Sequence, residues 1–101
     1  MLEQEEEKIY HLDGKEIKPI VVKHDFTEEM KVRAFELAFE SLEKYSFEKD
    51  IADFIKQKFD QELYLCWQCV VGKDFAVSLS HESENFLFFS VENSYFLLFK
   101  V

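Results

Sequence analysis

The chain has 101 residues, which is enough for one compact domain and too few for a second. With 48% hydrophobic residues, 12 of them Phe, and only 2 Gly and 1 Pro, the composition excludes a disordered or low-complexity chain. The formal net charge of −9 argues against a nucleic-acid partner, because a phosphate backbone would be repelled. An acidic start, no uncharged run as long as a membrane span and only 2 Cys predict a soluble, intracellular protein without a disulfide framework.

The first residues of the chain differ from the rest. Residues 1–19 contain three consecutive glutamates, end at the only proline and show neither helical nor alternating periodicity before Ile17. Such a pattern is typical of a solvated segment. We therefore expect a flexible acidic arm over residues 1–19, followed by one folded domain over residues 20–101.

Two helices are predicted after a short strand. The β-branched residues 20–22 follow the proline and indicate the strand. Thr27 is placed to cap a first helix over residues 28–45, where apolar residues recur every three or four positions. Ser46 offers a second cap, and apolar residues at every fourth position of 51–63 predict a second helix.

From residue 64 onward the pattern changes to β-branched and aromatic runs separated by short polar turns. These runs predict four strands, over residues 65–71, 75–80, 85–91 and 94–100. The expected fold class is α+β, with two N-terminal helices packed on an antiparallel sheet. In the last two strands apolar residues occupy successive positions, so both faces of the sheet are apolar. Two helices can cover only one face, and the other predicts self-association as a dimer.

No catalytic or metal constellation is predicted. Cys66 and Cys69 have the C-x-x-C spacing, but on a strand these positions point to opposite faces, which favours two buried structural cysteines. His81 and Glu82 begin a motif like that of zinc proteases, yet Asn85 stands where the second histidine belongs. We therefore expect no enzyme activity, no metal and no cofactor.

The strand over residues 75–80 has two readings of equal weight. Large side chains alternate there with small ones, namely Phe75, Val77 and Leu79 with Ala76, Ser78 and Ser80. At the edge of a sheet this strand could accept a strand from a sister subunit or from a peptide. Otherwise it is an ordinary hairpin strand.

Several segments together resemble a known family. They are Glu28-Glu29-Met30, Leu42-Glu43-Lys44-Tyr45, Glu48-Lys49-Asp50-Ile51-Ala52, Phe59-Asp60, Trp67, Cys69, Val71-Gly72, Phe75, His81-Glu82 and Leu97-Leu98-Phe99-Lys100. At these spacings the chain resembles the eight-kilodalton dynein light chain family, without a gap from about Ile20 to Lys100.

This resemblance implies a non-catalytic homodimer in which the strand over residues 75–80 crosses to the partner's sheet. The family binds extended segments, often containing Thr-Gln-Thr, as an added strand, and so pairs dynein intermediate chains and other partly disordered proteins. Carried over position by position, the peptide-binding residues would be Glu48, Lys49, Phe75, Ala76, Val77, Ser78, Leu79, Ser80, His81, Phe86, Phe88, Ser90, Tyr95 and Leu97. The implied dimer contacts are Trp67, Gln68, Cys69, Phe75, Val77 and Leu79.

Some positions depart from the family's usual residues. Ala76, Val77 and Ser78 replace glycine, serine and tyrosine, while Phe88 and Ser90 replace tyrosines. These differences suggest a specialised light chain, in the cytoplasm and cytoskeleton or in the axoneme of a cilium or flagellum. The alternative is a fixed structural subunit of an axonemal dynein that pairs with another light chain and selects no peptide.

One departure concerns the implied dimer contact. The family usually has a histidine there, whose protonation disrupts the dimer below neutral pH, and this chain has Gln68. Because glutamine does not titrate, we expect a dimer without that acid switch.

Overall fold

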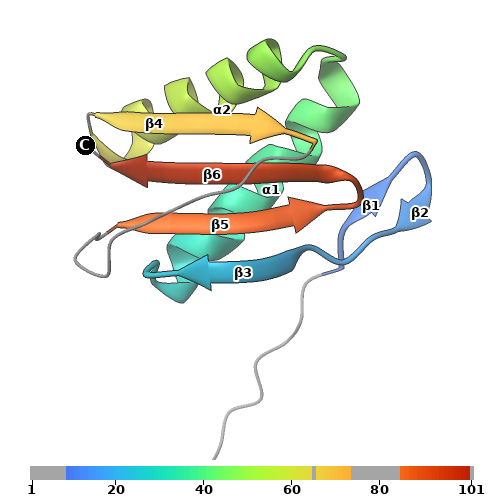
Figure 1. The fold of residues 1–101 in the computed structure, drawn as a ribbon, viewed down its shortest axis with the longest axis horizontal. Helices are drawn as coiled ribbons and strands as arrows, with labels where there is room; N and C mark the ends of the chain where they lie inside the picture. Colours follow the sequence, from blue (N-terminus) through green and yellow to red (C-terminus); the bar gives the residue numbers. More distant parts are fainter. Residues whose placement is uncertain (1–8, 65, 74–84, 101) are drawn as a thin grey trace, which may run out of the picture.

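The computed structural model describes residues 9–64, 66–73 and 85–100. In this part of the chain two helices pack on a four-stranded antiparallel sheet of order β3-β5-β6-β4, and a separate two-stranded hairpin precedes them (Figure 1). The elements are β1 (His11–Leu12), β2 (Lys15–Glu16), β3 (Ile20–His24), α1 (Glu28–Lys44), α2 (Glu48–Leu63), β4 (Trp67–Gly72), β5 (Phe86–Val91) and β6 (Ser94–Lys100). The α+β fold class is confirmed.

The last hairpin has the register that the sequence predicts. Residues Glu92 and Asn93 form the turn between β5 and β6, and Glu92 adopts a φ of 56°. Ser90 lies opposite Tyr95 across this hairpin, as expected for a two-residue connection. The strand expected over residues 75–80 lies outside the described residues.

The two helices begin in different ways. Thr27 caps α1 as predicted, since its hydroxyl oxygen accepts a hydrogen bond from the Met30 N–H at 3.2 Å. The predicted Ser46 cap of α2 is wrong. Phe47 is the N-cap, its carbonyl accepts the Ile51 N–H at 3.1 Å, and its own side chain makes no capping hydrogen bond. The helix therefore starts one residue later than a Ser46 cap would place it.

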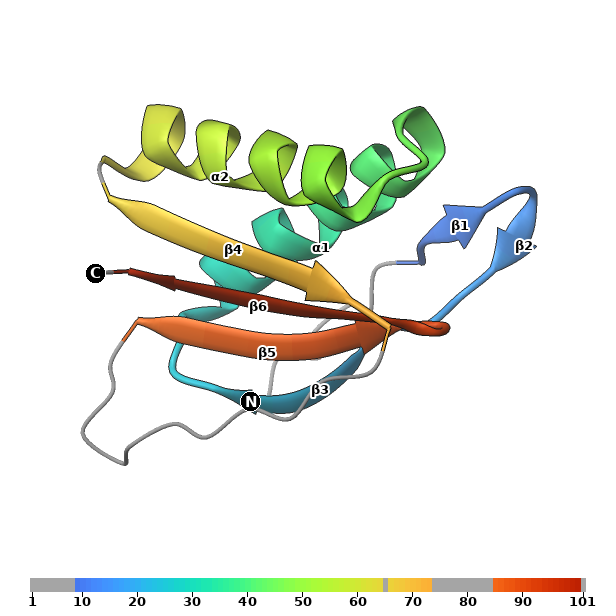
Figure 2. The same cartoon turned by 45° about the horizontal axis from the view of Figure 1, so that its top comes forward.

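Both helices lie against the same face of the sheet (Figure 2), so the expectation that they cover only one face is confirmed. The core between the layers contains alternate residues of each strand, which is how a strand divides its side chains between two faces. From the last two strands these are Leu87, Phe89, Val91, Phe96 and Leu98, and the helices supply Ala34, Phe35, Leu37, Ala38, Phe39, Ile51, Ile55 and Phe59.

The helices are also joined by one two-pronged ion pair. The Arg33 guanidinium donates to both carboxylate oxygens of Glu62, at 2.8 and 2.7 Å, and so links α1 to the end of α2. The same guanidinium contacts Glu36 at 3.1 Å. The Glu62 contact, and to a lesser extent the Glu36 contact, raises the pKa of Arg33, and the Arg33 contact lowers the pKa of Glu62.

We expect Arg33→Met to cost less than about 1 kcal/mol of stability at neutral pH, because both partners are well exposed to solvent. A carboxyl whose pKa is lowered in the folded state stabilises that state above the unfolded pKa, and the effect is lost as pH falls through the folded pKa. The difference between the two proteins should therefore vanish in acid. Urea unfolding at several pH values measures it, and a difference that grows below pH 4 would contradict the assignment.

The N-terminal segment differs from the expected solvated arm. Over residues 9–17 the chain folds into a β-hairpin, in which the Ile17 N–H donates to the Tyr10 carbonyl at 2.9 Å. Asp13 and Gly14 form its turn with φ values of 54° and 77°. This is the left-handed geometry that an Asp-Gly pair favours.

The hairpin packs on α1 through an aromatic side chain. The Tyr10 ring stacks on Phe39 at 4.9 Å between centroids and meets Phe35 edge-on at 5.9 Å. Leu12 and Ile17 also pack against the core. The expected arm is therefore wrong for residues 9–17, because these apolar side chains bury themselves against the helix. Residues 1–8 lie outside the described part of the chain.

The edge strand β3 contains a β-bulge. Val21 pairs with Phe89 and Lys23 with Phe88, so that Val22 is an extra residue without a partner position in the ladder. Its side chain is exposed, as is that of Ile20. A bulge of this kind twists and interrupts an edge strand.

No helix in the described residues is long and apolar enough to cross a membrane. In the same part of the chain, no three His, Cys, Asp or Glu side chains are grouped so that they could hold a metal ion.

Candidate functional site

The structure brings five of the predicted peptide-binding residues together on the outer face of the sheet, away from the helices. They are Phe86, Phe88 and Ser90 on β5 and Tyr95 and Leu97 on β6. Phe88 lies opposite Leu97 and Ser90 opposite Tyr95. The rings of Phe88 and Tyr95 meet at 5.9 Å, tilted by 38°. These five residues are called the groove floor below.

The groove floor is apolar at its centre. Leu97 and Phe86 are buried, and Ser90 is 7% exposed although it is polar. Tyr95 is partly exposed beside it. Within this pair, the large Tyr95 ring projects from β6 and the small Ser90 side chain lies on β5. The groove floor is therefore higher over β6 than over β5 at this position.

Strand β4 forms one edge of the sheet, and the described residues place no strand beyond it. Gln68 and Val70 point to the outer face, and Val70 is 44% exposed. Figure 1 shows this strand at the margin of the sheet, beneath α2. An edge strand presents unpaired N–H and C=O groups to any strand that approaches. Of the three predicted dimer contacts that the structure describes, Trp67, Gln68 and Cys69, Gln68 is the one whose side chain faces outward.

The side chain of Trp67, another predicted dimer contact, is buried in the core of its own chain. Its side chain is 2% exposed and meets Phe59 edge-on at 5.0 Å and Phe26 at 5.7 Å. The Lys100 ammonium lies 5.6 Å from the centre of the ring. The Trp67 side chain therefore has little surface left for a partner.

Cys69, also predicted at the dimer contact, lies on the helix-facing side of β4. Burial, and to a lesser extent Asp53, raises the pKa of its thiol to about 12, so the thiol stays protonated at neutral pH. Cys66 is free as well, but it is exposed. The prediction of two buried cysteines is therefore wrong for Cys66, because β4 begins only at Trp67 and the preceding residue lies outside the ladder.

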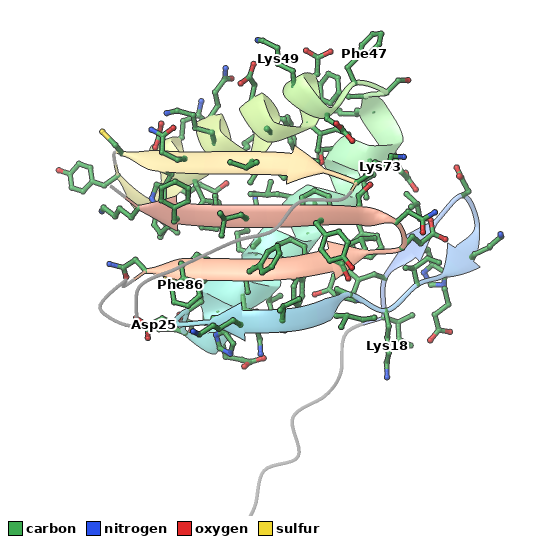
Figure 3. The ribbon with its side chains drawn as sticks, viewed as in Figure 1. Lys18, Asp25, Phe47, Lys49, Lys73 and Phe86 are labelled. Carbon is green, nitrogen blue, oxygen red and sulfur yellow. The ribbon has the colours of Figure 1, made fainter. Side chains whose placement is uncertain are left out.

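Glu48 and Lys49 lie in the first turn of α2. The Lys49 ammonium pairs with Asp53 at 3.1 Å and is largely exposed. Figures 1 and 3 place the start of α2 near the end of β4 that leads to Lys73. These two residues therefore belong to the edge of the molecule that β4 forms, rather than to the groove floor.

The structure also gives a role to a residue that the sequence analysis named only as part of the family resemblance. Asp60, in α2, accepts a hydrogen bond from the Trp67 backbone N–H at 2.8 Å and one from the Lys56 ammonium at 2.6 Å. The Lys56 contact, followed by the Trp67 N–H, lowers the pKa of Asp60. The sequence shows only a lysine and an aspartate four residues apart on a helix, which usually indicates a surface pair.

The remaining predicted site residues fall outside the described part of the chain. They are Phe75, Ala76, Val77, Ser78, Leu79, Ser80 and His81. Their roles in peptide binding and in the dimer stay predictions.

Comparison with known proteins agrees with this architecture. The family profile described as dynein light chain type 1 matches residues 18–101. The chain is similar to a cytoplasmic dynein light chain of Emericella nidulans, with 40% identity over 83% of this chain and 89% of that protein. It is also similar to a dynein light chain of Schistosoma mansoni, with 39% identity over 84% of this chain and 96% of that protein.

Solved structures with the same fold include the dynein light chain-like domain of the Fasciola hepatica calcium-binding protein FhCaBP2. Its TM-score is 0.71 at 19% identity, over 82% of this chain and 91% of that one. The dynein light chain-like domain of CsTAL3 has a TM-score of 0.71 at 15% identity, over 82% and 92% of the two chains. At these identities the likeness supports the fold alone, whereas the profile and the two relatives cover most of the sequence. The chain belongs to the dynein light chain type 1 family.

Proposed function

We propose that this chain is a non-catalytic, dimeric light chain of a cytoplasmic dynein motor. It binds extended segments of dynein intermediate chains or of other partly disordered proteins by β-strand addition, and it thereby holds two such segments together. The family supports a role in dynein, and the open edge of β4 beside the apolar groove floor is the observation that carries strand addition.

The strand that each copy contributes is proposed to be residues 75–80. Strands β4 and β5 are not neighbours, since β6 lies between them. Residues 73–85 connect them, which is many more than a hairpin turn needs and enough for a strand of six residues. Exchanging this strand with a second copy would extend each sheet at β4 and close a twofold dimer. An extended peptide would then add beside the exchanged strand, which forms the new edge of the sheet.

Titration with a peptide containing Thr-Gln-Thr, followed by calorimetry, tests peptide binding. Micromolar binding that a Thr-Ala-Thr peptide lacks supports the proposal. A dimer that binds neither peptide would instead support the alternative, a fixed axonemal subunit that does not select peptides.

The dimer itself is tested with two exposed valines, one on each edge strand of the sheet. Val70→Lys places a charge beside the open edge of β4 and should convert the dimer to monomer in sedimentation. Val22→Lys places the same charge on β3, at the other edge of the sheet, and should leave the dimer intact. If both variants stay dimeric, the dimer does not form at β4.

Gln68 allows a separate prediction about pH. Because its side chain faces outward and does not titrate, dimer dissociation should change less than about twofold between pH 7 and pH 5.5. Gln68→His should make the same dimer dissociate at least about tenfold more readily at pH 5.5, because protonation would place a charge in the contact. Sedimentation equilibrium at the two pH values measures both, and monomer appearing in the unmodified protein over this range would refute the prediction.

A further inference from the structure

The hydrogen bonds of β6 show which groups of β4 face the open edge. The Lys100 N–H donates to the Asn85 carbonyl at 3.1 Å, on the β5 side, so the backbone of Lys100 points away from β4. Its partner position on β4 is Trp67. In an antiparallel pair, hydrogen-bonded and non-hydrogen-bonded positions alternate. Trp67, Cys69 and Val71 therefore turn their N–H and C=O groups outward, to the open edge.

The first of these outward N–H groups is already occupied within the chain. The Trp67 N–H donates to Asp60 Oδ1 at 2.8 Å, and Asp60 Oδ2 is held by the Lys56 ammonium at 2.6 Å. The Asp60 side chain is only 15% exposed, because it sits where α2 crosses the start of β4. The carboxylate thus lies at one end of the open edge, while the outward groups of Cys69 and Val71 have no strand beside them in the described residues.

We propose that Asp60 is the positioning residue that sets the register of strand addition, by closing the open edge at Trp67. The added strand, residues 75–80 of a second copy, then pairs with Cys69 and Val71 and ends before Trp67. This inference rests on the proposed function, since it requires that a strand is added at β4.

Because the Trp67 N–H is already bonded to Asp60, it can exclude a wrong register of the added strand that the pattern of side chains alone would allow. A slip of one residue would move every side chain of the added strand to the wrong face. A slip of two residues keeps each side chain on its face, and residues 75–80 alternate large and small side chains with that same period. Closing the edge at Trp67 removes the extra backbone pairing that the slipped register would gain.

Amide hydrogen exchange on the full-length chain, at protein concentrations below and above dimerisation, tests this inference. In the unmodified protein, the Trp67 amide should be equally protected in monomer and dimer. The amides of Cys69 and Val71 should gain at least tenfold protection in the dimer. In Asp60→Ala, the Trp67 amide should exchange at least tenfold faster in the monomer and become protected on dimerisation, because the added strand now reaches it.

Two matched variants separate register from stability. Asp60→Asn keeps an oxygen that can accept from Trp67, and Lys56→Met removes only the ion pair, so both should behave as the unmodified protein. If Asp60→Ala leaves Trp67 unprotected in monomer and dimer alike, Asp60 is merely structural and the inference fails. Should that variant not fold, protection of Trp67 in the unmodified protein that appears only with dimerisation would equally overturn it. If Cys69 and Val71 never gain protection in the unmodified protein, strand addition itself, and with it the proposed function, is wrong.

Discussion

Tyr10→Ala should lower the free energy of unfolding by about 2–3 kcal/mol, because it removes the ring that fastens the N-terminal hairpin to α1. That ring stacks on Phe39 and meets Phe35, and a two-stranded hairpin of this size is not stable by itself. Urea unfolding gives the size of the loss. Limited trypsin digestion shows whether the loss is located in the hairpin, since cleavage after Lys15 and Lys18 should become much faster.

Tyr10→Phe is the matched control and should change stability in the opposite direction. The Tyr10 hydroxyl is buried, and none of the residues that the structure describes forms a hydrogen bond with it. Burial, followed by the negative charges of Glu36 and Glu28, raises the pKa of Tyr10. The hydroxyl therefore lies in a site that disfavours a negative charge. Removing an unsatisfied buried hydroxyl while keeping the stacked ring should stabilise the protein by about 1 kcal/mol. A loss of stability in this variant would show that the hydroxyl has a partner after all.

Tyr95→Ala should cost about 2 kcal/mol of stability and widen the range of peptides that the protein binds. Tyr95 is partly exposed on the groove floor, where its ring contacts Phe88 and faces the small Ser90. We expect the ring to narrow the groove and to select a segment with a small residue opposite it. Peptide arrays that vary one position at a time, followed by calorimetry on the best binders, measure the change.

Tyr95→Phe keeps the ring and should preserve both stability and peptide preference. If Tyr95→Ala binds the same peptides with unchanged affinity, Tyr95 does not line the groove. The correspondence with the family through the β5–β6 hairpin would then be wrong.

Most of the sheet and both helices were predictable because their side chains repeat with a clear period. The predicted strands over residues 85–91 and 94–100 leave a two-residue turn between them, and a turn of that length sets Ser90 opposite Tyr95, as the structure has it. The N-terminal hairpin was missed because two-residue strands are too short to show alternation. Asp13-Gly14 between Leu12 and Lys15 was the available signal, since this dipeptide favours the left-handed turn that the structure has.

The site was less predictable, because its contacts depend on where each element ends and on how different elements pack against one another. The exposure of Cys66 depends on where β4 begins, and strand ends are poorly marked in a sequence. Trp67 could be placed on a strand, but which face it occupies depends on how α2 crosses that strand. Asp60 looked like an ordinary helical surface residue until its contact with the Trp67 N–H was visible.

The bulge in β3 bears on how large an assembly can grow. A sheet with two regular edges could add one chain after another and form a fibre, as open head-to-tail contacts do. Here the unpaired Val22 interrupts the ladder of β3, so that edge offers no even row of donors and acceptors, whereas β4 has no such interruption. If two chains exchange strands reciprocally at β4, as proposed, both acceptor edges are filled by a twofold contact, and the interrupted edge of β3 gives a third chain no regular ladder to extend.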